Sequence, residues 1–313
     1  MAQDFLKIEG IPTGDVEPSI DTNQLGEVKK EVPKRGSKKS IQGLMVEEAN
    51  DPNKIKVTIA DKKTPIVILF GPPSAGKTMM LVRMTKWLYK NGYKVEPQRH
   101  FRNAEDAAYQ SLCDNFNSLV SSPNAAEATN VISFMLLKVS DAQGNPLCQI
   151  LEAPGEHYFD EDYPENDFPR YINEIVNGSN SKIWLILTEP NWRNQNNRDA
   201  YVNRVRSLTT RSRSKDKFII VLNKVDNTPF AYGVAKVNNK AARGMIESEY
   251  EALFTIFKNT HPITSLWRSS YADFISFQSG SFPKDNDGNV TYQIGPDEYV
   301  SRLWKLILKK LRG

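Results

Sequence analysis

Residues 71–78, GPPSAGKT, follow the apolar run 67–70 and could bind a phosphate chain. They fit the pattern of a glycine, any four residues, then glycine, lysine and serine or threonine. Phosphate oxygens must be met by backbone N–H groups, and glycine permits both the close approach and the dihedral angles this requires. Lys77 would place a positive charge on the β and γ phosphates, and the Thr78 hydroxyl would ligate Mg²⁺. The residues expected to contact the phosphates are Gly71, Ser74, Ala75, Gly76, Lys77 and Thr78.

A second motif, NKVD at 223–226, follows the apolar run 217–222. Ligands of open α/β sheets bind at the carboxyl ends of strands, which is where this motif lies. Guanine presents N1–H and an amino group side by side, and the Asp226 carboxylate could accept both hydrogens. Adenine offers no such pair, so such a site would discriminate between the two bases. The Lys224 stem could cover the base and ribose, while Asn223 would tie this loop to the phosphate loop.

The elements that must position these motifs are read from the hydrophobic pattern. Helices that follow strands indicate an α/β fold, in which strands pair mostly in parallel. Two strand-like runs flank the short loop at 141–144, so they predict a hairpin and hence one antiparallel strand. The sequence therefore predicts a doubly wound, mostly parallel sheet. The expected strands are 55–60, 65–70, 131–140, 145–154, 181–190, 217–223 and 271–278, and the expected helices are 77–92, 103–122, 168–178, 198–213, 238–260 and 296–312.

The order of the two motifs resembles that of the Ras-like and translation-factor-like (TRAFAC) P-loop GTPases, and this chain looks like a divergent member. The resemblance covers residues 65–313 and rests on short motifs. It implies a G domain that binds GTP or GDP with Mg²⁺. The family's third motif, D-x-x-G, corresponds to EAPG at 152–155 if Glu152 replaces the aspartate. The resemblance implies that Glu152 helps to hold Mg²⁺ and that the Gly155 N–H meets the γ phosphate.

The resemblance also assigns roles to five further residues. Thr129 would be the switch threonine that closes over Mg²⁺ when the γ phosphate is present. Ser279 and Gly280 stand where a backbone N–H contacts the guanine oxygen. The family's water-positioning residue follows the D-x-x-G glycine, where this chain has Glu156 and then His157. Glu156 could act as a base or His157 could orient the water, or both could be solvated switch residues.

Intrinsic hydrolysis is expected to be slow. No arginine directly precedes Thr129, and Arg99 and Arg102 could serve only if their segment folds back. GTPases that lack such an arginine hydrolyse slowly without an activator. The sequence predicts a GTP-binding switch that slowly hydrolyses GTP, with an activator or self-association completing the site. Two alternatives are a GTP-bound scaffold with little turnover and an ATP-dependent P-loop enzyme.

The composition of the N-terminal segment and the lengths of two connections suggest a domain organisation. Residues 1–54 hold few large hydrophobic residues and the basic run 29–39, which predicts a mostly disordered basic tail. Residues 55–313 would form the G domain, with insertions near 95–125 and 281–295. The DNDGN stretch in the second insertion is expected to be a turn, because it lacks the later glutamate of a calcium loop.

Composition limits the choice of partners. The net charge of +4 over 313 residues gives no case for nucleic acid. No apolar run approaches the roughly 18 residues of a membrane span, so no membrane attachment is expected. Cys113 and Cys148 form no disulfide framework, which suggests a cytoplasmic protein. A protein partner is expected at the switch segments or at the 95–125 insertion, and oligomerisation is possible.

Overall fold

The computed structural model describes residues 43–121, 132, 134–190, 192, 194–263, 265, 270–281 and 292–312. These residues belong to one compact unit that spans residues 38–313. Three features singled out in the sequence lie outside the described residues: the basic run 29–39, the candidate switch residue Thr129 and the DNDGN stretch at 285–289.

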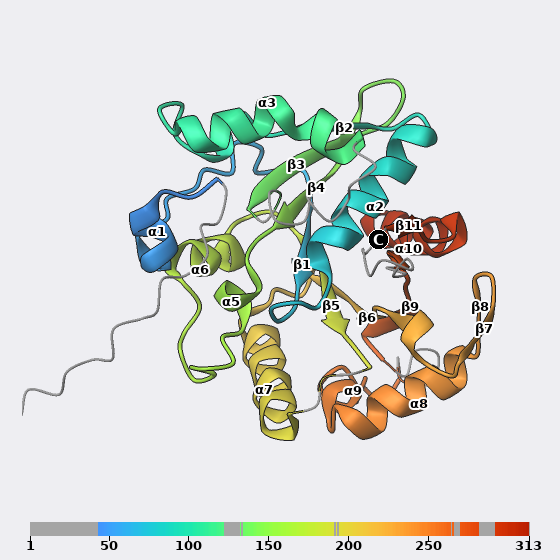
Figure 1. The fold of residues 1–313 in the computed structure, drawn as a ribbon. Helices are drawn as coiled ribbons and strands as arrows, with labels where there is room; N and C mark the ends of the chain where they lie inside the picture. Colours follow the sequence, from blue (N-terminus) through green and yellow to red (C-terminus); the bar gives the residue numbers. More distant parts are fainter. Residues whose placement is uncertain are drawn as a thin grey trace, which may run out of the picture. The chain divides into compact units, whose positions relative to one another are not determined.

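Within the described residues, seven strands form one sheet in the order β2-β3-β4-β1-β5-β6-β9 (Figure 1). Strand β3 is antiparallel to both of its neighbours, β2 and β4. The other neighbouring pairs are all parallel. The strands are β1 (Ile66–Phe70), β2 (Lys94–Pro97), β3 (Met135–Ser140), β4 (Pro146–Glu152), β5 (Lys182–Thr188), β6 (Lys217–Leu222) and β9 (Ala272–Ser276).

The central strands are buried on both faces. Every residue of β1 and β5 is buried, as expected of apolar strands in the middle of a parallel sheet that helices cover on both sides. The Phe70 ring at the end of β1 lies 5.0 Å from the Tyr158 ring and 6.0 Å from the Tyr201 ring. This packing fixes the point at which β1 passes into the loop at 71–76.

The helices complete a doubly wound arrangement. Helix α2 packs against α3 and α10, and α7 packs against α9 (Figure 1). The predicted fold class, a doubly wound and mostly parallel sheet with one antiparallel strand, is confirmed. No helix in the described part of the chain is long and apolar enough to cross a membrane. The longer helices are α2 (Lys77–Lys90), α3 (Ala107–Ser121), α6 (Arg170–Asn177), α7 (Gln195–Arg211), α8 (Asn239–Glu249) and α10 (Asp297–Leu311), and the shorter ones are α1 (Val46–Asn50), α5 (Gly155–Tyr158) and α9 (Leu253–Ile256).

Two small antiparallel pairs lie outside the main sheet. Strands β7 (Ala231–Gly233) and β8 (Lys236–Val237) form a hairpin shortly after the NKVD motif. Strands β10 (Gly280–Ser281) and β11 (Gln293–Ile294) bring together the two ends of the predicted insertion at 281–295. That insertion therefore starts and ends at one place beside the end of β9.

Two strand assignments differ from the sequence prediction. Residues 55–60, predicted to be a strand, form none; the Thr58 N–H donates instead to the Phe101 carbonyl at 2.9 Å. Strand β2, which the sequence did not predict, extends one edge of the sheet inside the region taken as an insertion. Its four residues, KVEP, include two charges and a proline, so their composition does not distinguish them from a loop.

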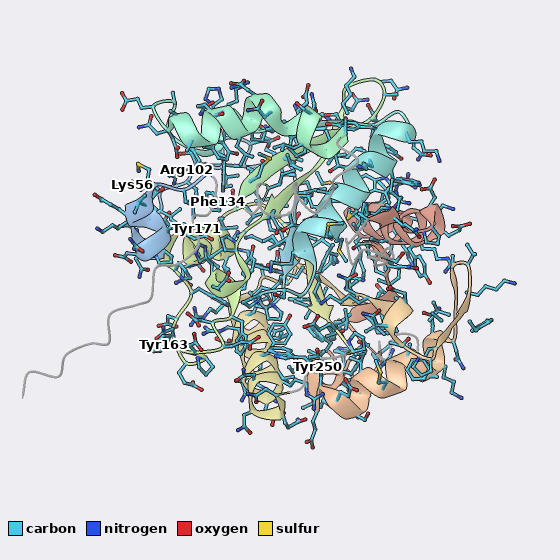
Figure 2. All side chains as sticks on the ribbon, viewed as in Figure 1. Lys56, Arg102, Phe134, Tyr163, Tyr171 and Tyr250 are labelled. Atoms are coloured by element: carbon cyan, nitrogen blue, oxygen red, sulfur yellow. The ribbon has the colours of Figure 1, made fainter. Side chains whose placement is uncertain are left out.

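Residues 43–54, which precede the domain boundary predicted at residue 55, contact a segment that is distant in the sequence. The Arg102 guanidinium, with only 3% of the side chain exposed, pairs with Glu48 of α1 at 2.5 Å and with Asp106 at 2.8 Å. It also donates to the Lys56 carbonyl at 2.7 Å. Figure 2 shows Arg102 between Lys56 and Phe134. A buried charge needs such partners, and composition alone cannot reveal them.

Arg102→Lys is expected to lower the free energy of unfolding by about 1–2 kcal/mol, because one ammonium cannot replace a guanidinium that bonds three groups. Urea unfolding measures the change. The matched control is Arg99→Lys, since Arg99 pairs with Asp114 on the surface and this variant should be nearly as stable as the wild type. Equal, small losses in both variants would show that the Arg102 cluster does not order the N-terminal segment.

Candidate nucleotide-binding site

The phosphate-loop motif lies between a buried strand and a helix, as its chemistry requires. The loop leaves β1 and enters α2 at Gly76, whose φ of +82° is a left-handed conformation that favours glycine. A Cβ at Gly76 would also lie 2.4 Å from the Asn223 Nδ2 atom. Ser74 is left-handed as well, with a φ of +60°. The backbone is thus bent into a tight loop at the N-terminus of a helix, an arrangement suited to binding an anion.

Lys77 lies inside this loop. Its buried amine donates to the Gly71 carbonyl at 3.1 Å and to the Pro72 carbonyl at 2.9 Å. Burial lowers the pKa of Lys77, and the Glu152 carboxylate opposes that shift. Because its hydrogen-bond acceptors among the described residues are carbonyls, this desolvated amine would gain strongly from an anionic oxygen placed beside it.

Thr78 and Glu152 form a pair of oxygen ligands next to the loop. The Thr78 hydroxyl donates to Glu152 Oε1 at 2.8 Å. Glu152 ends β4 and is only 1% exposed, and its Oε2 has no hydrogen-bond partner among the described residues. Burial raises the pKa of Glu152 to about 8, whereas Lys77 acts to lower it. An unpaired buried carboxylate oxygen beside a hydroxyl fits a hard cation such as Mg²⁺.

The rest of a metal shell would have to come from other sources. Within the described residues, no group of three or more histidine, cysteine or acidic side chains could hold a metal ion. Mg²⁺ commonly keeps several waters and binds through one or two carboxylates plus substrate phosphates. Thr78 and Glu152 fit that mode of binding.

Gly155 brings the segment after β4 against the phosphate loop. A Cβ at this position would lie 2.3 Å from the Pro73 nitrogen and 2.5 Å from the Pro72 carbonyl carbon. Only glycine allows this approach of two backbones, so the motif's glycine is required by packing as well as by the proposed phosphate contact. Helix α5 begins at Gly155 itself, and its start is therefore close to whatever the loop binds.

The NKVD motif is hydrogen bonded to the phosphate loop. The buried Asn223 side chain donates from Nδ2 to the Ala75 carbonyl at 2.8 Å. The Lys224 amine donates to the Ser74 carbonyl at 2.9 Å. Lys224 has a φ of +55°, which turns the chain sharply after β6. Two motifs 150 residues apart in sequence are thus joined by side-chain bonds to adjacent loop carbonyls.

Asn223→Ala is expected to weaken GDP binding about 10-fold, because the Ala75 carbonyl loses its donor and the loop loses a restraint. Equilibrium titration with a fluorescent GDP analogue measures the change. Asn227→Ala is the control, since Asn227 is exposed within the same turn. An unchanged affinity in the Asn223 variant would contradict a role for this bond in nucleotide binding.

Asp226 and Ser279 lie on connected loops. Asp226 is exposed in the 3₁₀ turn η3 (Val225–Asn227), and nearby protein atoms desolvate its carboxylate enough to raise its pKa. The Val225 N–H donates to the Phe277 carbonyl at 3.2 Å, which joins this turn to the end of β9. Ser279 is buried, and its Oγ has no partner among the described residues. Gly280 packs tightly, because a Cβ there would lie 2.4 Å from the Gln293 carbonyl oxygen.

The two candidate water-positioning residues differ in their surroundings. Glu156 is exposed, whereas His157 is buried. The His157 Nδ1 atom lies 2.6 Å from the Tyr171 hydroxyl on α6. In this conformation His157 has a packing role, and Glu156 is the member of the pair that faces solvent.

The two candidate arginines serve other purposes. Arg102 is held in the buried cluster with Glu48 and Asp106. Arg99 pairs with Asp114 of α3 and also donates to Gln110 at 3.3 Å. Neither is available to stabilise charge at the phosphate loop in this structure.

One residue of the site was missed by sequence reasoning. Glu189 follows β5, and its carboxylate pairs with the Lys224 amine. It belongs to no motif, but it stands at the carboxyl end of the strand next to β1. Glu189 is thus beside the point where the strand order reverses. Ligands of open α/β sheets bind at this point, so the position could have identified Glu189 from the sequence.

No family model matches the chain, and no curated protein matches it. The chain is similar to several solved structures. One is the Saccharomyces cerevisiae Ski7 GTPase-like domain bound to GDP and inorganic phosphate, with 16% identity, 80% of this chain and 50% of that chain covered, and a TM-score of 0.41. The same domain bound to GTP matches with 18% identity and a TM-score of 0.40 over the same shares.

A third similar structure is a nucleolar GTP-binding protein 1 from Plasmodium falciparum, with 15% identity, 82% of this chain and 92% of that chain covered, and a TM-score of 0.39. The chain covers only half the length of the Ski7 structures. At these low identities and TM-scores the similarities carry no argument about activity, so the chemistry of the site has to do so.

Proposed function

We propose that this protein binds guanine nucleotide together with Mg²⁺. The observation that carries the proposal is the pair of bonds from Asn223 to the Ala75 carbonyl and from Lys224 to the Ser74 carbonyl. Because these bonds hold the NKVD motif against the phosphate loop, a nucleotide with its phosphates in the loop would have its base near Asp226.

Asp226 accounts for the choice of base. A carboxylate accepts two hydrogens from guanine, N1–H and the 2-amino group. Adenine presents an acceptor at N1 and no amino group at position 2, so it would leave the carboxylate unsatisfied. A site built to bind specific donors rejects ligands that lack them by factors of about 10⁴. Ser279 and Gly280 would provide the backbone contact to the guanine oxygen.

Mg²⁺ would be held by Thr78 and Glu152, and it would neutralise charge on the β and γ phosphates. Lys77 would supply the second positive charge there. Gly155 would offer its N–H to the γ phosphate. Since α5 begins at Gly155, loss of the γ phosphate would break this contact and allow the segment after Gly155 to move.

We further propose slow hydrolysis of GTP to GDP and phosphate, with Thr129 and residues 152–165 acting as a conformational switch. This assignment follows the resemblance to the Ras-like and translation-factor-like GTPases. Glu156 would orient the attacking water, although its negative charge near the γ phosphate is unfavourable. Arg99 and Arg102 are engaged elsewhere, which supports a low intrinsic rate.

A second candidate is a GTP-bound scaffold with little turnover. The packing of His157 against Tyr171 favours it, because that packing occupies one of the two residues that could position a water. In such a scaffold the bound nucleotide would organise assembly and remain intact.

Competition and turnover experiments test these proposals. Unlabelled GTP should displace a fluorescent GDP analogue at least 1,000-fold better than ATP does, and equal displacement by ATP would overturn the guanine assignment. Release of phosphate from bound GTP then separates the switch from the scaffold: slow, sustained release supports the first, and intact GTP after hours supports the second. A fast rate that is independent of protein concentration would contradict the need for an activator or self-association.

We propose a cytoplasmic location, because Cys113 and Cys148 are buried free thiols. A protein partner would bind the switch segments or helix α3 of the predicted 95–125 insertion.

A further inference from the structure

Glu189 directly follows β5, and Lys224 of the NKVD motif contacts both Glu189 and the phosphate loop. Its carboxylate oxygen Oε2 pairs with the Lys224 amine. The Glu189 side chain is 13% exposed and that of Lys224 is 36% exposed, so the pair is partly shielded from water. The same amine donates to the Ser74 carbonyl at 2.9 Å. Lys224 is therefore fixed at its tip by two acceptors.

The backbone of Glu189 is itself fixed by a buried tyrosine. The Tyr250 hydroxyl donates to the Glu189 carbonyl at 2.9 Å and accepts from the Glu189 N–H at 3.1 Å. Tyr250 follows α8 directly and is fully buried; Figure 2 labels it near α7 and α9. One hydroxyl thus satisfies both backbone groups of Glu189, which sets the direction from which the carboxylate reaches Lys224.

The Lys224 amine has two possible partners, the Glu189 carboxylate and a phosphate of the bound nucleotide. Its four-carbon stem carries considerable rotamer entropy, and its ammonium is attracted to any nearby phosphate. Glu189 supplies a negative charge in direct contact with the amine, at the end of β5. With its amine held by this charge and by the Ser74 carbonyl, the Lys224 stem keeps one direction.

We propose that Glu189 is a positioning residue that holds Lys224 as a cover for the base and ribose of the bound guanine nucleotide. This inference rests on the proposed function. Phosphate binding is left to Lys77, whose amine is at the Gly71 and Pro72 carbonyls. Binding energy is gained because the cover is already formed before the nucleotide arrives.

The test compares four versions of the full-length protein: wild type, Glu189→Gln, Lys224→Met and the double variant. Dissociation of a fluorescent GDP analogue is followed by stopped-flow, and GDP affinity by titration. Glutamine has the size of glutamate without its charge, so Glu189→Gln should weaken GDP binding about 5- to 10-fold, mainly through faster dissociation. In the Lys224→Met background the same substitution should change GDP affinity less than 2-fold. Glu247→Gln, which removes a surface partner of Arg243, is the charge control.

Each outcome has a defined meaning. An effect that disappears in the Lys224→Met background supports the proposal, because a general structural defect would persist there. An equal effect in both backgrounds, or no effect in either, overturns the inference and leaves guanine binding intact. Failure of the wild type to bind GDP overturns the proposed function itself. Glu189→Asp, which keeps the charge but is one methylene shorter, should restore part of the affinity lost in Glu189→Gln; no restoration would count against the charge as the cause.

Discussion

Asp226→Asn is expected to weaken GTP binding by roughly 10- to 150-fold, which corresponds to the 1.5–3 kcal/mol of a lost charged hydrogen bond. The amide that replaces the carboxylate has one acceptor and one donor group, so it can satisfy N1–H but opposes the 2-amino group. The exposed position of Asp226 in a short turn means that the fold should be unaffected. Titration of GTP and thermal unfolding, measured together, separate binding from stability.

Xanthosine triphosphate provides the control for this variant. Xanthine carries a carbonyl oxygen where guanine carries the 2-amino group, and the asparagine amide can donate to it. The variant should therefore bind xanthosine triphosphate better than the wild type does. Unchanged GTP affinity, or a loss for both nucleotides alike, would show that Asp226 does not read this edge of the base.

The central fold and the placement of the two motifs could be predicted from the sequence because they depend on local pattern. The apolar runs of β1, β5 and β6 identify buried strands, and the glycines of 71–78 mark a loop that backbone geometry requires. The hairpin of β3 and β4 follows from its turn. The predicted link from Asn223 to the phosphate loop is present as a hydrogen bond to the Ala75 carbonyl.

Features that depend on distant pairs could not be predicted in this way. Helix α1 is ordered by Arg102, which lies 54 residues from Glu48 in sequence. The contact of Glu189 with Lys224 spans 35 residues and belongs to no motif. The burial of His157 depends on Tyr171 of a neighbouring helix. In each case a charge or ring nitrogen is satisfied by a side chain that no periodicity connects to it.

The proposed role of Glu152 as a cation ligand requires a buried negative charge, and burying that charge lowers the stability of the fold. A carboxylate that is to meet a cation must stay deprotonated, but its site on β4 is almost fully buried. Burial raises the pKa of Glu152 to about 8 in the nucleotide-free protein, against an ordinary value of 4.5. The folded state therefore holds this proton more tightly than the unfolded state does. Stability from this group is present below pH 4.5 and is lost as the pH rises toward 8.

Glu152→Gln is expected to stabilise the nucleotide-free protein by on the order of 2–3 kcal/mol at pH 8.5, and to have little effect on stability near pH 4.5. Removal of the buried charge alone would give a larger gain in stability. Lys77 loses the favourable Glu152 charge in the variant, and this loss offsets part of the gain. The same substitution should abolish most of the increase in GDP affinity that Mg²⁺ gives, since a neutral amide is a poor ligand for a hard cation. Urea unfolding across this pH range, and GDP titration with and without Mg²⁺, measure the two effects. A variant that is less stable than the wild type at pH 8.5, or that keeps its full response to Mg²⁺, would mean that residue 152 is not a buried cation ligand.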